Sequence, residues 1–338
     1  MRPHLKWIVL VETTLLLLVL GFFVYNYTDY LSLKNKIDPQ YEEELLSKEL
    51  YAGVYQEESF VNVNYAPLKE GLKDYFATNK ISAAIYIQDL ISAGSMGIDE
   101  YSKFNPASLN KLMLAIILMK EVEEGKIKMD QMVVLEKRSS YGDLYQSNLT
   151  EIPFQVLFEK MLTESDNTAF FSLVPIMDPN TEELILSYLD LIPETDQKPY
   201  TLTPRSILNV YLSLYHSTIL TTKNSEYILY LLKNSVPNIR EVAGIPKTVR
   251  IAHKSGVVYE KEEKEYRDCG IMYYKEDRIF YCIMITNQTK EQSEKIAATV
   301  VRYIYDYQKF QNQKLKEFES LCSPNCRKIS FDQSNMVN

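Results

Sequence analysis

A serine and a lysine three residues apart open a strongly apolar segment, FNPASLNKLMLA, which covers residues 104–115. On a helix, residues three apart are neighbours, so the amine of Lys111 could reach the hydroxyl of Ser108. A serine is a poor nucleophile until a base takes its proton, and a lysine serves as that base only when burial lowers its pKa. A helix N-cap followed by a surface lysine explains the same residues, so this motif alone decides nothing.

A second polar triplet, Ser165-Asp166-Asn167, follows a predicted helix over residues 153–161. The hydroxyl of Ser165 could pass a proton to a leaving group, and the amide of Asn167 can both donate to and accept from a substrate amide. The same residue types are also favoured at a helix N-cap, and another helix is expected to begin here. Taken by itself, the cap is a sufficient explanation.

A third motif, Lys254-Ser255-Gly256, lies in a segment with the composition of a strand, IAHKSGVVY. A lysine here could pair with a substrate carboxylate, and the serine hydroxyl could hydrogen-bond to it. The glycine would let a ligand approach the strand edge closely. An exposed edge strand with a bulge is the alternative. His253, beside the lysine, is expected to be a strand residue that could tune the lysine.

The elements that must position these motifs change in character along the chain. Residues 67–79 predict a helix, residues 82–90 a strand and residues 92–97 a turn. Helical patterns dominate over residues 108–232, and Gly125 is expected to end the first of these helices.

The final third is rich in β-branched and aromatic residues. Three segments, 247–259, 266–274 and 277–287, predict an antiparallel meander, and residues 291–318 predict a closing helix. Strands therefore flank a helical middle. We predict an α+β fold in which an antiparallel sheet is flanked by helices and joined to a helical subdomain, with a site in the cleft between them.

The N-terminus carries an apolar segment, residues 7–25, preceded by three basic residue types at Arg2, His4 and Lys6. About 20 apolar residues span a bilayer, so we expect a membrane anchor with its basic end in the cytoplasm. A cleaved signal peptide is the alternative, although no small-residue cleavage site follows. We expect a single-pass membrane protein with an anchor (1–27), and then, outside the cytoplasm, a stalk (28–66), a globular domain (67–319) and a polar tail (320–338).

The bulk composition excludes several functions. The 338-residue chain has a formal net charge of -8 and no arginine-rich helix, which argues against a nucleic-acid partner. We expect a monomer, and we predict no metal or other cofactor, because the cysteines lack metal-type spacing. Export permits disulfides, and free buried thiols are the alternative. The two possible pairs are Cys269–Cys282 and Cys322–Cys326.

In chain order, the three motifs match the S-x-x-K, S-D-N and K-T-G set of class A β-lactamases and penicillin-binding proteins. The chain therefore resembles a class A β-lactamase-type serine hydrolase over residues 67–307. The resemblance extends to flanking segments such as VAGIPKTVRIAHKSGVV and DCGIMYY, which are similar to two of the family's sheet strands. It implies a β-lactamase-like fold and a substrate that is a β-lactam or a peptidoglycan peptide ending in D-Ala-D-Ala.

The resemblance also gives the motif residues their roles. Ser108 would be the acylated nucleophile, Lys111 its base and Ser165 a proton relay. Asn167 would bind an amide of the substrate, and Lys254 with Ser255 would bind its carboxylate. Gly256 would leave space for the substrate beside the strand, and Tyr145 would lie at the rim of the pocket. The backbone N–H groups of Ser108 and Val257 would form the oxyanion hole.

One part of the family pattern is missing from this sequence. Class A β-lactamases carry a glutamate, in an E-x-x-L-N segment, that orients the water which hydrolyses the acyl-enzyme. The corresponding interval, residues 167–203, holds no such segment. Glu194 is the nearest candidate by position, but a surface loop carboxylate is the better explanation for it. The alternative function is a slow-turnover or non-catalytic penicillin-binding or wall-binding module.

Overall fold

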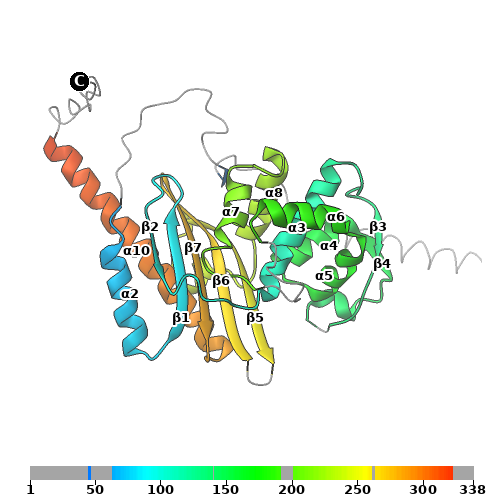
Figure 1. The fold of residues 1–338 in the computed structure, drawn as a ribbon, viewed down its shortest axis with the longest axis horizontal. Helices are drawn as coiled ribbons and strands as arrows, with labels where there is room; N and C mark the ends of the chain where they lie inside the picture. The colour runs from blue at the N-terminus through cyan, green and yellow to red at the C-terminus, as the bar shows by residue number, and fades with distance from the viewer. Residues whose placement is uncertain (1–44, 47–62, 140, 192–200, 261–262, 323–338) are drawn as a thin grey trace, which may run out of the picture. The chain divides into compact units, whose positions relative to one another are not determined.

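The computed structural model describes residues 45–46, 63–139, 141–191, 201–260 and 263–322. A five-stranded antiparallel sheet lies at its centre, with the strand order β2-β1-β7-β6-β5 (Figure 1). The predicted antiparallel sheet is therefore confirmed. Its strands are β1 (Ser82–Asp89), β2 (Ser95–Ile98), β5 (Arg250–Glu260), β6 (Glu263–Tyr274) and β7 (Asp277–Thr286).

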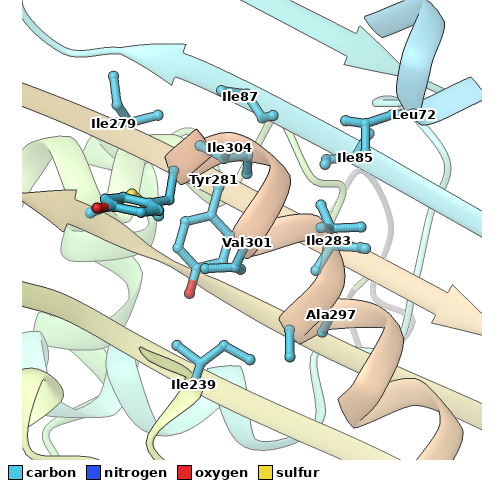
Figure 2. Close-up of a cluster of buried hydrophobic side chains, with 14 of the residues drawn as sticks. Leu72, Ile85, Ile87, Ile239, Ile279, Tyr281, Ile283, Ala297, Val301 and Ile304 are labelled. Atoms are coloured by element: carbon cyan, nitrogen blue, oxygen red, sulfur yellow. The ribbon is translucent and has the colours of Figure 1, made fainter. Parts of the chain in front are cut away.

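The first and last long helices of the described chain cover one face of this sheet. These are α2 (Ala66–Thr78) and α10 (Lys290–Cys322), which lie side by side (Figure 1). Figure 2 shows Ala297, Val301 and Ile304 of α10 among the isoleucines of β1 and β7. Removing such side chains from water is the dominant favourable term in folding. Because β7 is the middle strand and both its faces are covered, all but its two end residues are buried.

The opposite face of the sheet packs against a helical unit built from the residues between β2 and β5. Tyr211 of this unit meets Phe280 of β7 with ring centroids 5.5 Å apart. The unit also contains a two-stranded ribbon of β3 (Met132–Val134) and β4 (Glu151–Pro153). Its helices are η3 (Ala107–Leu109), α3 (Asn110–Glu123), η4 (Asp143–Gln146), α4 (Phe154–Thr163), α5 (Asn167–Leu173), η5 (Val174–Ile176), α6 (Pro179–Tyr188), α7 (Leu208–Tyr215), α8 (Thr222–Lys233) and α9 (Ile239–Val242).

Local sequence signals explain several boundaries. Pro67 lies in the first turn of α2, where its missing N–H costs nothing, and the helix closely matches its prediction. Gly125 follows α3 with a φ of +73°, as its predicted helix-ending role requires. The turn predicted over residues 92–97 is partly wrong, because Ser95–Ile98 forms β2. This short edge strand is specified by its pairing with β1, which the local pattern does not contain.

A disulfide joins two of the four cysteines. Cys269 of β6 and Cys282 of β7 lie directly opposite each other in the strand register, and their sulfur atoms are bonded. This is one of the two pairings that the sequence left open, and it excludes free thiols at these positions. The other proposed pair includes Cys326, which lies outside the described residues.

Two residues of the predicted stalk, Leu45 and Leu46, are buried, and the hydroxyl of Tyr273 donates to the carbonyl oxygen of Leu45 at 2.8 Å. At the other end, α10 continues past the predicted residue 318 to Cys322. The predicted anchor, residues 1–27, lies outside the described residues. Among the helices of the described ranges, none is long and apolar enough to cross a membrane.

Candidate active site

Ser108 lies in a single 3-10 turn, η3, which runs directly into α3. It is therefore not an α-helix N-cap, because α3 begins two residues later at Asn110. The preceding residue, Ala107, has a φ of +48°, and its N–H donates to Oδ1 of Asn105 at 2.9 Å. A left-handed conformation costs an alanine about 1 kcal/mol. Such local strain is often found where a protein fixes a functional side chain.

Gly256 allows strand β5 to approach this turn closely. A Cβ atom at position 256 would lie 3.0 Å from the backbone nitrogen of Ser108 and 3.3 Å from the Cβ of Ala107. Both distances are tighter than ordinary contacts, so a side chain here would push the turn and the strand apart. The structure thus shows that this glycine admits the turn that carries Ser108. That it also lets a ligand approach the strand edge stays a prediction.

The amine of Lys111 is bound on three sides by the second motif. Its Nζ donates to the carbonyl oxygen of Ser165 at 2.5 Å, to Oγ of Ser165 at 3.1 Å and to Oδ1 of Asn167 at 2.7 Å. Only 2% of the Lys111 residue is exposed. An ammonium group has three N–H donors, and this arrangement uses all of them. The structure thus brings together three predicted site residues from two distant parts of the chain.

Burial lowers the pKa of Lys111 to about 7, and the carboxylate of Asp166 opposes this shift. Near neutral pH a substantial fraction of the amine is therefore neutral and carries the lone pair that a base needs. In the described part of the chain, no hydrogen bond joins Lys111 to Ser108. To take the proton of Ser108, the amine must give up one of its present contacts.

The buried side chain of Asp166 fixes the turn formed by Ser165, Asp166 and Asn167. Its buried carboxylate accepts from the backbone N–H of Ala169 at 2.8 Å, as the N-cap of α5, and from that of Leu144 at 3.1 Å. Gly142, with a φ of +107°, passes so close that a Cβ there would collide with the carboxylate of Asp166. The helix cap that explained this motif by itself therefore exists, but only Asp166 provides it. Its two neighbours contact Lys111 instead.

The amide of Asn167 bridges Lys111 and a loop serine. Because a lysine ammonium only donates, Oδ1 of the amide faces Lys111 and Nδ2 points the other way. Nδ2 donates to Oγ of Ser139 at 3.0 Å, and the backbone N–H of Asn167 donates to the carbonyl oxygen of Tyr141 at 3.0 Å. Ser139 is absent from the sequence-based site, because nothing in its local context distinguishes it from other loop serines.

The third motif lies on β5, the edge strand nearest η3. Lys254 is 1% exposed, whereas Ser255 and Val257 are half-buried. Burial lowers the pKa of Lys254 well below its usual value, and the charge of Lys111 lowers it further. The two buried lysines are therefore close enough to influence each other. Tyr145, the predicted rim residue, lies on η4 and is 41% exposed.

Comparison with known proteins agrees with this geometry. The model of a family described as the β-lactamase enzyme family matches residues 67–308. The chain belongs to the β-lactamase enzyme family. The resemblance to a β-lactamase-type serine hydrolase is thereby confirmed. No curated protein matches the chain.

Solved structures of similar fold include both β-lactamases and a penicillin-binding protein. A mutant of PBP-A, as its acyl-enzyme complex with penicillin G, has a TM-score of 0.64 and 20% identity, over 75% of this chain and 100% of that chain. The TLA-3 extended-spectrum β-lactamase has a TM-score of 0.64 and 17% identity, over 72% and 99%. A β-lactamase from Chitinophaga pinensis has a TM-score of 0.63 and 15% identity, over 71% and 98%. At these identities the likeness shows the fold alone.

The family's deacylating glutamate has no counterpart among the described contacts of Lys111. In the described ranges, the amine hydrogen-bonds to no carboxylate, and the ring of Phe170 lies 5.8 Å away, measured to its centroid. Glu194, the candidate by position, falls in residues 192–200, outside the described residues. In the described ranges, the amine of Lys111 therefore has neutral oxygen partners and no carboxylate partner.

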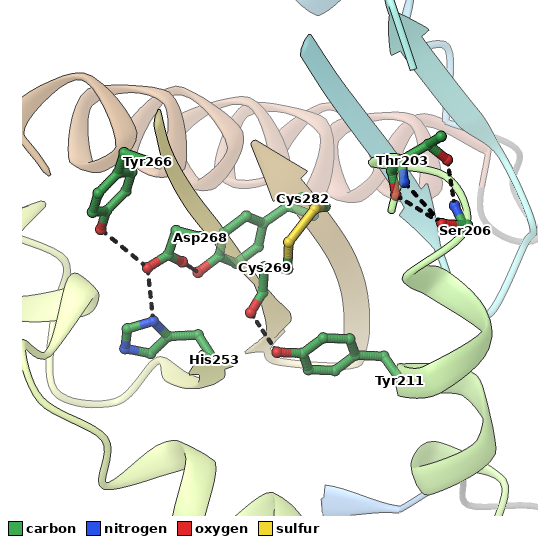
Figure 3. The surroundings of a disulfide bond; sticks show 9 residues. Thr203, Ser206, Tyr211, His253, Tyr266, Asp268, Cys269 and Cys282 are labelled. Carbon is green, nitrogen blue, oxygen red and sulfur yellow. Dashed lines mark hydrogen bonds and ion pairs between the residues drawn. A yellow bond between two sulfur atoms is a disulfide. The ribbon is translucent and has the colours of Figure 1, made fainter. Parts of the chain in front are cut away.

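Strand β6 contributes two buried charges that the motif analysis missed. Arg267 is fully buried beside Gly256, and its Nη2 donates to Oε2 of Glu265. Asp268, the next residue, is also fully buried and lies near the disulfide (Figure 3). The available signal was an Arg-Asp pair in the middle of an otherwise apolar strand, because buried charges are rare unless paired.

Proposed function

We propose that this protein forms an acyl-enzyme at Ser108 with β-lactams or with peptidoglycan peptides ending in D-Ala-D-Ala. The observation that carries the proposal is the buried amine of Lys111, which contacts Ser165 and Asn167 and lies one turn from Ser108. Membership of the β-lactamase family supports it. So does the fold shared with PBP-A, one structure of which is an acyl-enzyme complex with penicillin G.

The remaining motif residues would bind the substrate. Its carboxylate would pair with the cationic form of Lys254 and accept from the hydroxyl of Ser255. The carbonyl of its acylamide would accept from Nδ2 of Asn167. The reacting carbonyl oxygen would accept from the backbone N–H groups of Ser108 and Val257, which stabilise the oxyanion that develops during attack. Tyr145 would line the rim.

Acylation then needs two proton transfers. Neutral Lys111 takes the hydroxyl proton of Ser108 while Oγ attacks the carbonyl carbon. As the C–N bond of the lactam or peptide breaks, Ser165 gives its hydroxyl proton to the leaving nitrogen. It recovers a proton from the ammonium of Lys111, 3.1 Å away. Lys111 ends neutral and Ser108 ends as an ester, so the protons balance.

We propose that deacylation is slow. Hydrolysis of the ester requires a base that activates water, and no carboxylate contacts Lys111 in the described ranges. Such behaviour is closer to a penicillin-binding protein than to an efficient β-lactamase. A non-catalytic wall-binding module is the second candidate, and the same observation favours it.

Intact-mass spectrometry of the folded protein after incubation with penicillin G tests the acyl-enzyme. We expect one penicillin adduct on the wild type and none on Ser108→Ala. A folded wild type without adduct, or an equal adduct on the variant, would refute the proposal. Hydrolysis of a chromogenic cephalosporin and of a D-Ala-D-Ala peptide then ranks the two substrates. A long-lived adduct without turnover of either would identify a slow penicillin-binding module.

We also propose that residues 1–27 anchor the protein in a membrane and that the domain lies outside the cytoplasm. The support is the apolar run of residues 7–25 with basic residues before it. The full chain should sediment with membranes, and a chain that begins at residue 28 should not. Finding both in the soluble fraction would contradict the anchor.

A further inference from the structure

A buried carboxylate, Asp268, lies on β6, the strand that pairs with β5, which carries the third motif. It stands opposite Ser255 in the register of β5 and β6, and the next residue, Cys269, stands opposite Lys254. A buried carboxylate is costly unless it is hydrogen-bonded. Asp268 accepts from the hydroxyl of Tyr281 at 2.7 Å, contacts Nδ1 of His253 at 3.0 Å and lies 3.5 Å from the hydroxyl of Tyr266 (Figure 3).

His253 is held through both of its ring nitrogens. The backbone N–H of Ile239 donates to Nε2 at 3.4 Å, so Nε2 is an acceptor. The proton of the neutral ring is then assigned to Nδ1, which donates to Asp268. The carbonyl oxygen of His253 also accepts from Oγ of Ser235 at 2.9 Å. A neutral histidine in this position orients the carboxylate of Asp268 without cancelling its charge.

Lys254 is a buried basic side chain close to this buried acid. It forms no ion pair with a carboxylate of the described residues. Successive side chains of a strand point to opposite faces, so Lys254 and Asp268 lie on opposite faces of the sheet, on neighbouring strands. Both residues are buried, and charges interact more strongly in a buried environment than in water. In agreement, Asp268 raises the pKa of Lys254 against the larger effect of burial and the effect of Lys111.

Other polar groups surround this pair. Lys111 approaches from α3 and Tyr211 from α7, and the hydroxyl of Tyr211 donates to the carbonyl oxygen of Cys269 at 2.5 Å. Arg267 lies next to Asp268 in the chain, but its side chain bonds to Glu265. Lys111 therefore disfavours a proton on Lys254, and Arg267 is bound to Glu265. Asp268 is the group that favours it.

We propose that Asp268 is the charge partner of Lys254 and that, held by Tyr281 and His253, it keeps this lysine cationic for an anionic substrate. Asp268 touches neither the substrate nor Ser108, so it is a positioning residue. The inference rests on the proposed function, because Lys254 is assigned there to the substrate carboxylate. It predicts that loss of Asp268 weakens the recognition of a negative charge and leaves the acyl-transfer chemistry unaltered.

A chromogenic cephalosporin carries a carboxylate that its methyl ester lacks, so comparing the two distinguishes loss of charge recognition from a general structural defect. For Asp268→Asn, the second-order acylation rate with the free acid at pH 8 should fall about tenfold, the effect of one pKa unit on Lys254. The rate with the ester should not change. Because Lys254 then loses its proton more readily, the alkaline limb of the pH profile with the acid should move to lower pH. Equal losses for acid and ester, or an unchanged ratio, would overturn the inference.

Two further variants guard against loss of folding. Asp89→Asn removes another buried carboxylate of the same sheet, one that accepts from Ile91 and Ser92, and should leave the acid-to-ester ratio unchanged. Tyr281→Phe keeps the carboxylate of Asp268 and removes one donor to it. It should lower the ratio of the acid rate to the ester rate, as Asp268→Asn does, but by a smaller factor. An unchanged ratio in this folded variant would contradict the proposal.

Failure of the proposed function is distinguishable from failure of this inference. If wild-type protein acylates with neither compound, the proposed function fails. Equilibrium binding of the acid and the ester to Ser108→Ala, with and without Asp268→Asn, then decides the role of Asp268. Selective weakening of acid binding supports that role. Equal binding of acid and ester, or no binding of either, overturns it.

Discussion

The Nζ atom of Lys111 lies 2.7 Å from Oδ1 of Asn167, and in the described ranges its hydrogen-bond partners are all neutral oxygens. Neutral dipoles stabilise an ammonium less than a carboxylate would, so the cost of burial dominates. This explains why the pKa of Lys111 falls to about 7, although Asp166 opposes the shift. A substantial fraction of the amine is therefore neutral near pH 7, as the proposed role of Lys111 as a base requires.

Acylation should therefore depend on pH in a defined direction. The neutral form of Lys111 accumulates as pH rises through about 7, so with the cephalosporin methyl ester, which does not need the charge of Lys254, the second-order acylation rate should rise across that range and then level off. Lys111→Met should lower this rate about 100- to 10,000-fold, the usual contribution of a general base. Lys120→Met, on the same helix α3, is the control and should acylate normally. A flat profile between pH 5 and about 9 would exclude Lys111 as the base.

Ser139 should matter only for substrates that have an acylamide side chain. Its Oγ accepts one of the two N–H bonds of the Asn167 amide at 3.0 Å and leaves the other for the substrate. Ser139→Ala should lower the acylation rate with penicillin G about fivefold, which corresponds to about 1 kcal/mol for one hydrogen bond. With 6-aminopenicillanic acid, which lacks the acylamide, the rate should be the same as for wild type.

The matched control for this experiment is Ser147→Ala. Ser147 belongs to the same loop region, but its Oγ accepts from the backbone N–H of Leu149 and does not contact Asn167. It should affect neither substrate. If Ser139→Ala reduces both rates equally, the serine supports the loop and does not position the amide.

Much of this architecture could be predicted from local patterns. The strands β5, β6 and β7 follow from short β-rich segments separated by charged turns, and α10 from a long amphipathic run. The three motifs also pointed to the correct family, because their order along the chain is specific even where each is common alone. These features are encoded within a few residues of each other.

The contacts that complete the site could not be predicted in that way. Asp268 contacts His253 because β5 and β6 pair in one particular register. Ser139 contacts Asn167 where the backbone N–H of Asn167 also donates to the carbonyl oxygen of Tyr141, two residues further along the loop. A register shift of one residue would send every side chain to the other face. Such contacts depend on the assembled fold, so the local periodicity of the sequence does not predict them.

Gly256→Ala should impair acylation far more than it impairs folding. The added Cβ would lie 3.0 Å from the backbone nitrogen of Ser108 and displace this proposed oxyanion-hole donor, and loss of such a donor costs about 100- to 1,000-fold in rate. Gly71→Ala is the control, because nothing lies within 4 Å of a Cβ there and alanine favours helix α2 by about 1 kcal/mol. If a folded Gly256→Ala protein acylates at the wild-type rate, the turn that carries Ser108 can move away from β5 without a loss of acylation.

Residues of the segment before the domain should contribute to the stability of the domain itself. Leu45 is 0% exposed, and its carbonyl oxygen accepts from the hydroxyl of Tyr273 on β6. Leu45→Ala should lower the free energy of unfolding by about 2 to 5 kcal/mol, as at other buried leucines. Tyr273→Phe should lower it by about 1 kcal/mol, the contribution of one hydrogen bond.

The control is Leu184→Ala, at a position on α6 that is 50% exposed, which should leave the free energy of unfolding nearly unchanged. Chemical denaturation of the three variants measures these differences, and an unfolding free energy for Leu45→Ala equal to that of wild type would mean that the domain is complete without this segment.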